Sequence, residues 1–243
     1  MTLITEKGLS PRRLRDIRAV LNRILEDAYY DEIIEKNPFN RVVRLPKKKT
    51  AEFFPFSTDE INSIRSHAQG QFRNMFALGF FTGMRTGEII GLRWEDVNFK
   101  ELTIKVERAI RQGIVSTPKT VGSIRTIEIL DTLTHFLQAQ YKLTVKQNSY
   151  VFLNQENTHF FDSDKIRGNY WKKTLERVNV EYRTFYQMRH IFASIMVSNG
   201  EDILWVSNML GHTTPEMTLK KYTRYVPKKK TIRASFLNEK ISA

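Results

Sequence analysis

The sequence predicts a mainly α-helical protein with a small antiparallel β-sheet near the middle of the chain. Two observations lead to this fold class. Apolar residues recur three or four positions apart, between capping and glycine signals, over most of the 243 residues. Only residues 101–130 change to an alternation of apolar and polar side chains, which is the pattern of strands. Hydrophobic residues make up 41% of the chain, which is enough for a packed core.

Residues 10–36 are predicted to form one amphipathic helix. Ser10 is placed as the N-cap, and Pro11 occupies the first helical position, where its missing N–H costs nothing. We expect the helix to end at Asn37, because a residue before proline is pushed out of the helical region. The apolar stripe consists of Leu14, Ile17, Leu21, Ile24, Leu25 and Ala28. A single helix cannot bury such a stripe, so the stripe must pack against another part of the chain or another subunit.

Basic residues cover much of the rest of this helix and continue into the segment that follows. Residues 41–49 are short, basic and interrupted by proline, as expected of an interdomain linker. We expect these cations to contact DNA phosphates, although on the helix alone a solvated face explains them equally well. The candidate DNA-binding residues are Arg12, Arg15, Arg18, Arg44, Lys47, Lys48 and Lys49. The predicted organisation is an N-terminal part over residues 1–46 and a main domain over residues 52–243.

The main domain is predicted to begin with helices at residues 58–68 and 71–82. Ser57 and Glu60 form a capping-box pattern before the first helix, and the second is apolar nearly all round, so we expect it to be buried. Gly83 stops the second helix and Thr86 can cap a new one, which leaves Arg85 in the break, directly before a helix N-terminus. Helix N-termini favour anions, and an arginine there can clamp one. Alternatively, Arg85 is structural and pairs with Glu88; both functions can hold at once.

A small antiparallel sheet of two or three strands is predicted next, with one strand carrying Leu102, Ile104 and Val106 and one carrying Ile124, Ile127 and Ile129. Lys119 lies in the turn region between them, where a lysine by itself is more often a mobile surface charge. The remaining predicted elements are a helix at 131–147, a short apolar strand at 151–153, and helices at 162–179, 184–198, 202–210 and 217 to about 225.

The last of these helices carry side chains suited to phosphate chemistry. Arg189 can hold a phosphate by two parallel hydrogen bonds. Histidines at 190 and 212 can exchange a proton near neutral pH. The hydroxyl of Tyr222 can attack phosphorus and form a covalent intermediate. Tyr186 lies three residues before Arg189 and is expected to share its helix face.

The net charge of +13 is spread along the whole chain, which favours a polyanionic partner, most simply nucleic acid, over a merely solubilising surface. The absence of cysteine excludes disulfides and thiolate chemistry. Five histidines without metal-ligand spacing predict no metal site. The apolar runs are too short to span a bilayer and the N-terminus is unlike a signal peptide, so we expect a cytoplasmic protein without a membrane partner.

Taken together, these motifs resemble the tyrosine recombinase family, also called the phage integrase family. Five segments carry the resemblance, in the family's order and within residues 53–226: residues 82–97, 118–125, 186–194, 210–212 and 218–222. The resemblance implies the catalytic-domain fold of that family. It also implies a catalytic set of Arg85, Lys119, Arg189, His212 and the nucleophile Tyr222, supported by Glu88, Tyr186 and His190.

One position departs from the family pattern. Tyr186 stands where relatives usually have a histidine, so only a phosphate contact is carried over to it. Tyr225 lies three residues beyond Tyr222 and is the alternative nucleophile, but the spacing from His212 favours Tyr222.

The resemblance further implies a site-specific DNA recombinase or integrase of a phage or mobile element. It would cleave double-stranded DNA through a 3′-phosphotyrosyl link and need no cofactor, metal or ATP. It would act in a bacterial or phage-infected cell, as a tetramer whose C-terminal tail, around residues 232–237, docks on a neighbouring protomer. Residues 9–38 would be the end of a helical core-binding domain. Two alternatives stay open: a type IB topoisomerase-like enzyme and a catalytically silent DNA-binding protein.

Overall fold

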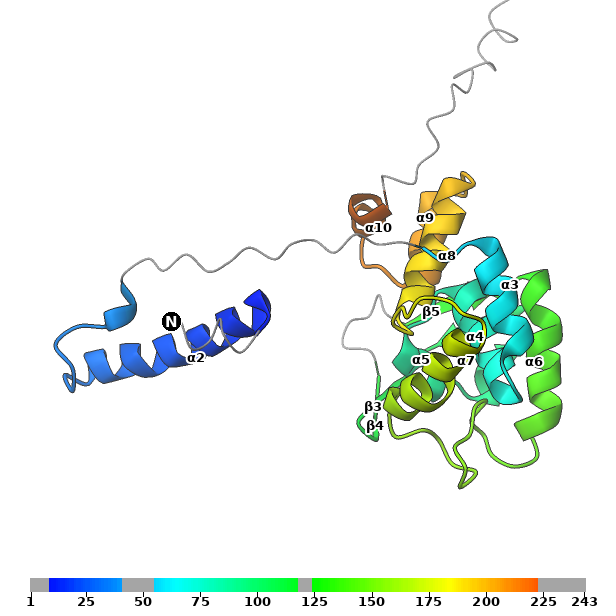
Figure 1. The fold of residues 1–243 in the computed structure, drawn as a ribbon, viewed down its shortest axis with the longest axis horizontal. Helices are drawn as coiled ribbons and strands as arrows, with labels where there is room; N and C mark the ends of the chain where they lie inside the picture. Colours follow the sequence, from blue (N-terminus) through cyan, green and yellow to red (C-terminus); the bar gives the residue numbers. More distant parts are fainter. Residues whose placement is uncertain (1–8, 41–54, 118–123, 223–243) are drawn as a thin grey trace, which may run out of the picture. The chain divides into compact units, whose positions relative to one another are not determined.

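The computed structural model describes residues 9–40, 55–117 and 124–222, and the chain divides into two units, Met1–Phe54 and Pro55–Ala243 (Figure 1). The N-terminal unit consists of helix α2, Pro11–Tyr30, and a short 3-10 turn η1, Pro38–Asn40. The predicted cap is confirmed, because the Ser10 hydroxyl accepts a hydrogen bond from the backbone N–H of Arg13 at 3.3 Å.

Helix α2 ends six residues earlier than predicted. Glu32 adopts a left-handed conformation with φ +58°, the N–H of Glu32 donates to the carbonyl of Tyr29, and the N–H of Ile33 donates to that of Ala28. These two bonds form a Schellman motif, which normally uses glycine or asparagine at the left-handed position. Because a glutamate stands there, the sequence carries no stop signal at this point.

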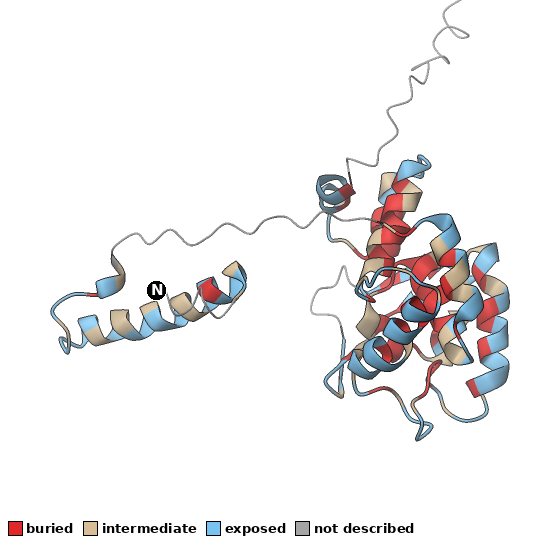
Figure 2. Ribbon diagram, viewed as in Figure 1, coloured by how far each residue is buried: buried red, intermediate tan, exposed pale blue. Residues whose placement is uncertain are grey.

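Within the N-terminal unit the apolar stripe of α2 stays largely uncovered (Figure 2). Leu14 is buried, whereas Leu21 is 43% and Ile24 is 57% exposed. The expectation that this helix cannot bury its own stripe is therefore confirmed for the unit taken by itself.

The core of the C-terminal unit is built around α4, Gln71–Thr82, which packs against three helices: α3, Thr58–His67; α6, Asp131–Thr144; and α8, Gln187–Ser198 (Figure 1). The predicted burial of α4 is confirmed, since eight of its twelve residues are buried (Figure 2). The ring of Phe76 meets the rings of Trp171 and Phe185 edge to face at 5.0 and 5.7 Å, an arrangement that aromatic rings prefer. The capping box of Ser57 and Glu60 is also confirmed.

The predicted antiparallel sheet is present, with three strands in the order β1, Val97–Asn98; β2, Thr103–Val106; and β5, Arg125–Glu128. Ile104 lies opposite Ile127, and both are buried. The sequence analysis missed a second sheet, the hairpin of β3, Ala109–Arg111, and β4, Ile114–Ser116. It also wrongly placed Leu102 in a strand, because this residue has φ +52° and forms the turn before β2.

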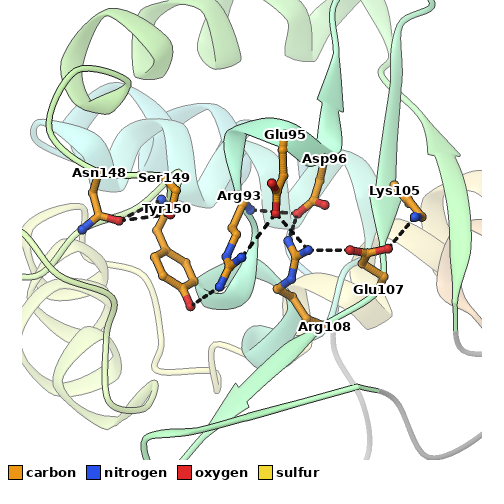
Figure 3. A network of polar contacts seen from close by, with 9 residues as sticks. All are labelled: Arg93, Glu95, Asp96, Lys105, Glu107, Arg108, Asn148, Ser149 and Tyr150. Atoms are coloured by element: carbon orange, nitrogen blue, oxygen red, sulfur yellow. Dashed lines mark hydrogen bonds and ion pairs between the residues drawn. The ribbon is translucent and has the colours of Figure 1, made fainter.

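Arg108 lies in the connection between β2 and β3, where a network of carboxylates holds its side chain (Figure 3). Its guanidinium pairs with Asp96, Glu107 and Glu95, and its side chain is only 12% exposed. Asp96 belongs to the 3-10 turn η2, Trp94–Asp96, and also accepts a hydrogen bond from the backbone N–H of Arg93 at 3.0 Å. The network joins the turn after α5, Thr86–Gly91, to the sheet.

The other helices of this unit differ from prediction mainly at their ends. Residues 162–179 contain a π-helix η4, Ile166–Trp171, followed by α7, Lys172–Arg177. Residues 151–153 are buried but form no strand, and the backbone bridge here joins Arg93 to Tyr150. Helices α9, Ile203–Leu210, and α10, Pro215–Tyr222, complete the described part. None of the described helices is long and apolar enough to cross a membrane.

Replacing Gly83 with alanine is expected to lower the free energy of unfolding by roughly 2–4 kcal/mol. Gly83 has φ +63°, and an added Cβ would lie 2.7 Å from the Phe192 ring and 2.8 Å from a Leu210 methyl group, so backbone strain and overpacking add. Urea unfolding followed by tryptophan fluorescence measures the change.

Two matched glycine variants separate the two contributions. Gly200→Ala has φ +85° and open space, so it tests the cost of a positive φ without overpacking. Gly168→Ala has open space and no positive φ, so it is expected to be neutral or slightly stabilising. Equal destabilisation by Gly83→Ala and Gly168→Ala would contradict this account.

Candidate active site

Arg85 is held at the break between α4 and α5, as predicted, but it is itself the N-cap of α5, in place of Thr86. Glu88 determines which residue is the N-cap, because its Oε2 accepts a hydrogen bond from the backbone N–H of Arg85 at 2.8 Å and so satisfies a free donor at the helix start. The other carboxylate oxygen, Oε1, accepts from Nη1 of Arg85 at 2.7 Å. Nη2 of Arg85 donates to the carbonyl of Gly211 at 3.2 Å. These two side-chain bonds use two of the five N–H groups of the guanidinium.

Arg189 lies on α8 and is 2% exposed. Its Nη1 donates to the carbonyl of Gly83 at 2.9 Å. Burial, together with the nearby charge of Arg85, lowers the pKa of Arg189 to about 10. Two guanidinium groups close enough to disfavour each other's charge make a site that an anion would stabilise.

Both arginines are therefore anchored on the ends of helices. Gly83 is the left-handed C-cap of α4 and Gly211 is the left-handed C-cap of α9, with φ +63° and +61°. The last carbonyls of a helix lack partners within it and carry partial negative charge, so they are suitable acceptors for arginine. The two glycines predicted as helix stops thus also orient the cations.

His212 follows directly after the Gly211 cap. Its Nδ1 lies 2.7 Å from Oγ1 of Thr218, which is buried and also lies 2.7 Å from Oγ of Ser207. This links the loop after α9 to α10. Burial, followed by the charges of Arg189 and Arg85, lowers the pKa of His212 to about 4, so its ring is neutral at pH 7.

Tyr222 is the last residue of α10 and is 1% exposed. Its hydroxyl lies 2.5 Å from Nδ1 of His190 on α8. Both His190 and His212 were predicted to be able to exchange a proton, and the structure brings His190 to this hydroxyl. Burial, and then the charges of Lys221 and Arg189, lower the pKa of His190 to about 4. A neutral imidazole can accept a hydrogen bond from the phenol.

Tyr186, at the start of α8, is exposed, whereas Arg189 is buried. It precedes α8 as its N-cap and is 42% exposed, whereas Arg189 points into the interior. The Tyr186 ring meets that of His190 edge to face at 5.2 Å. Helix α8 begins at Gln187, three residues later than the predicted start, but Tyr186 already has right-handed helical backbone angles, φ −61° and ψ −20°, and its charge acts on Arg189, so the helical spacing still applies.

Arg125 is the residue that the sequence analysis did not single out. It is the first residue of β5 and is 6% exposed. Its Nη2 donates to Glu88 at 2.9 Å and its Nε donates to the carbonyl of Met209 at 3.1 Å. The signal was available, because Arg125 is on the same face of the strand as the buried Ile127, and an arginine at an inward position needs a partner.

Several candidate residues lie outside the described part of the chain: Lys119, Arg44, Lys47, Lys48, Lys49, the alternative nucleophile Tyr225 and the C-terminal tail. On α2, Arg12 and Arg15 are exposed, and the Arg18 guanidinium lies 5.7 Å from the centre of the Phe39 ring. Among the described residues, histidine and carboxylate side chains form no cluster that could hold a metal ion.

The helical fold and the cluster of arginines, histidines and a tyrosine define the class as tyrosine-type site-specific recombinases. Residues 55–229 match the model of the phage integrase family, and the chain belongs to that family. The predicted family, fold class and enzyme class are thereby confirmed.

Curated relatives extend the match over almost the whole chain. A protein named "Tyrosine recombinase XerC-like" from Caldanaerobacter subterraneus subsp. tengcongensis is 30% identical over 96% of this chain and 68% of its own length. The ICEBs1 integrase of Bacillus subtilis is 27% identical over 97% of this chain and 68% of its own length. Among solved structures, the Tn1549 transposon integrase with circular intermediate DNA has a TM-score of 0.76 at 20% identity, covering 99% of this chain and 83% of that one. A lambda integrase dimer on a core site has a TM-score of 0.71 at 16% identity, covering 95% and 64%.

Stability is expected to fall as the pH is lowered from about 6.5 towards 4. The pKa values of His190 and His212 are lowered to about 4 in the folded chain, while an unfolded histidine titrates near 6.5. Between these two values the unfolded chain therefore binds protons that the folded chain does not. The contribution of the two neutral histidines to stability is complete above pH 6.5 and is lost progressively as the pH falls towards 4. Melting temperatures between pH 7.5 and 5 measure this, above the range in which Glu60 and Glu88 titrate.

The matched control is the double variant His190→Asn/His212→Asn, which should show a flatter pH dependence in this window. His67→Gln, at the exposed end of α3, should keep the dependence of the wild type. If the double variant and the wild type lose stability in parallel, these two histidines are not the cause.

Proposed function

We propose that Tyr222 is the nucleophile with which this recombinase cleaves and rejoins DNA, and that Arg85, Arg189 and His212 surround the reacting phosphate. One observation carries the proposal: segments far apart in sequence close a ring of contacts. His190 contacts the Tyr222 hydroxyl. The next residue back in sequence, Arg189, donates a hydrogen bond to Gly83 at the end of α4, close to Arg85. Arg85 in turn donates a hydrogen bond to Gly211, which precedes His212.

The chemistry follows from these groups. Oη of Tyr222 attacks the scissile phosphorus, the bond to the 5′-oxygen breaks, and a 3′-phosphotyrosyl link forms. Negative charge on the non-bridging oxygens is met by the guanidinium donors of Arg85 and Arg189, and preorganised donors of this kind are usually the largest catalytic contribution. Lys119, by family resemblance, protonates the leaving 5′-oxygen. A 5′-hydroxyl from a partner strand then reverses the step, and the phosphodiester energy is retained without ATP.

The position of Tyr222 adds a condition to this mechanism. Because the residue is 1% exposed and its hydroxyl is held by His190, helix α10 must shift away from α8 before a DNA phosphate can reach it. The imidazole of His190 is neutral at pH 7, so it can accept the phenolic proton of Tyr222 when α10 shifts away from α8. His212 then contacts the phosphate.

Double-stranded DNA is the proposed substrate, supported by the net charge of +13 and by the DNA-bound integrases of similar fold. In this proposal residues 52–243 are the catalytic domain, and residues 1–46 belong to a core-binding domain that contacts phosphates through Arg12, Arg15 and Arg18. The basic segment with Arg44 and Lys47 to Lys49 follows the duplex backbone. Assembly of four protomers with docking of the tail is carried over from the family resemblance.

The test is covalent capture of DNA. A pool of nicked duplexes with a randomised site, incubated with the protein in EDTA, should yield SDS-resistant adducts whose DNA sequences converge on one site. Peptide mapping should find the 3′-phosphate of the DNA linked to Tyr222. The cleaved DNA should carry a free 5′-hydroxyl. Absence of any adduct would falsify the recombinase mechanism and favour a silent DNA-binding protein. Relaxation of supercoiled plasmid without strand exchange would favour the topoisomerase-like alternative.

A further inference from the structure

Arg125 occupies the junction of three segments that carry candidate catalytic residues. It begins β5, where it pairs with Val106 of β2, and its side chain is directed into the interior. Lys119 lies six residues upstream in sequence. The guanidinium reaches both α5, which carries Glu88, and the end of α9, which precedes His212.

On the α5 side, Arg125 and Arg85 share one buried carboxylate. Oε1 of Glu88 accepts from Nη1 of Arg85 at 2.7 Å and from Nη1 of Arg125 at 3.2 Å. Oε2 accepts from the backbone N–H of Arg85 at 2.8 Å and from Nη2 of Arg125 at 2.9 Å. Glu88 is 3% exposed, so it cannot turn towards solvent, and any rotation breaks a contact to one of the arginines. Burial raises the pKa of this carboxyl, but the hydrogen bonds and charge of Arg125, with smaller contributions from Arg85, hold it below the usual value.

On the α9 side, the same guanidinium packs under the helix end. Nε of Arg125 donates to the carbonyl of Met209 at 3.1 Å. An added Cβ on Gly211 would lie 2.6 Å from Nη1 of Arg125, so the backbone here rests directly on the planar group. Gly211 is the residue whose carbonyl accepts from Arg85, and His212 comes next. One side chain thus supports Arg85 through Glu88 and His212 through the cap of α9.

We propose that Arg125 is a positioning residue for DNA cleavage, which sets Arg85 and His212 at the correct distance from each other. The inference rests on the proposed function and deepens it. A buried ion pair contributes little net stability compared with apolar packing, but it fixes geometry, and a guanidinium hydrogen-bonded through Nε, Nη1 and Nη2 fixes it in a plane. Displacement of a catalytic group by about 1 Å can cost on the order of 10²-fold in rate.

The first measurement is the single-turnover rate constant for adduct formation at saturating protein, on the site recovered by covalent capture. Arg125→Met is expected to lower this rate constant by roughly 30–100-fold, because Glu88 loses one of its two arginines. Arg125→Lys keeps the charge without the planar fork and is expected to lower it about 10-fold. DNA affinity should change less than about 3-fold, since the residue is buried and acts on orientation.

Arg108→Met is the matched control. Arg108 is also a little-exposed arginine bridging carboxylates, but it belongs to the network between β2 and η2 (Figure 3). Its loss should lower the melting temperature as Arg125→Met does, with no change in the rate constant of the folded fraction. A second arm uses an Arg85→Met background, in which Arg125→Met should cost clearly less than it does in the wild type, because only the support of His212 through the cap of α9 is left to lose.

Two results would overturn the inference while leaving the proposed function intact. One is an unchanged rate constant in Arg125→Met and Arg125→Lys with only a lowered melting temperature. The other is a fully multiplicative loss in the double variant with Arg85→Met. If the wild type itself forms no adduct, the proposed function fails and the inference fails with it, so the two failures are told apart by the wild-type reaction.

Discussion

Tyr222→Phe is expected to abolish covalent adduct formation, with residual cleavage at least about 10⁴-fold below that of the wild type, because phenylalanine has no nucleophilic oxygen. The ring itself should stay in place, since it is 1% exposed and α10, which carries it, packs against α8 and α9. The hydrogen bond to His190 is lost, which lowers the free energy of unfolding by about 1 kcal/mol. DNA binding, measured by gel shift on the captured site, should therefore persist.

Two other tyrosines serve as controls for this result. Tyr225→Phe should keep the adduct, and so should Tyr186→Phe, whose side chain lies outside the buried cluster. An adduct that survives Tyr222→Phe but disappears with Tyr225→Phe would transfer the nucleophile assignment to Tyr225. A tenfold or smaller effect of Tyr186→Phe would fit an auxiliary phosphate contact.

Arg189→Met is the second variant with a large expected effect, a loss of roughly 10²–10³-fold in the single-turnover rate constant. Its guanidinium is 2% exposed and is oriented by the carbonyl of Gly83, and burial, followed by the charge of Arg85, lowers its pKa to about 10. Removing it leaves the transition-state charge with one arginine. Because methionine relieves the repulsion between the two cations, the stability of the free protein should change little, while phosphate affinity falls.

Arg183→Met is the control for the loss of a partly buried arginine. Arg183 makes two hydrogen bonds to Glu60, at 3.0 and 3.2 Å, and stacks its guanidinium 4.3 Å from the centre of the Phe56 ring. Its replacement should lower the melting temperature and leave the rate constant unchanged. A rate constant of Arg189→Met within a factor of about 3 of the wild type would exclude a direct role at the phosphate.

Features fixed by near neighbours in sequence could be predicted closely. Helix α4 has the predicted bounds of residues 71–82, because its apolar run and the following glycine act locally. The capping box at Ser57 and the glycine cap at residue 211 involve partners within a few residues, so their chemistry is visible in sequence. The end of α2 and the turn at Leu102 were missed, because non-glycine residues adopt positive φ there.

The sequence by itself determined the residue types of the candidate site and the helix breaks that hold them: Arg85 after Gly83, His212 after Gly211, and Arg189 and Tyr222 on short helices. It could not determine which groups meet. Only the tertiary structure decided that Tyr222 contacts His190, 32 residues away, and that Arg125 and Arg85 share Glu88. The physical reason is that periodicity and caps report bonds within one element, whereas the partner of a buried charge is chosen by the packing of distant elements that must satisfy it.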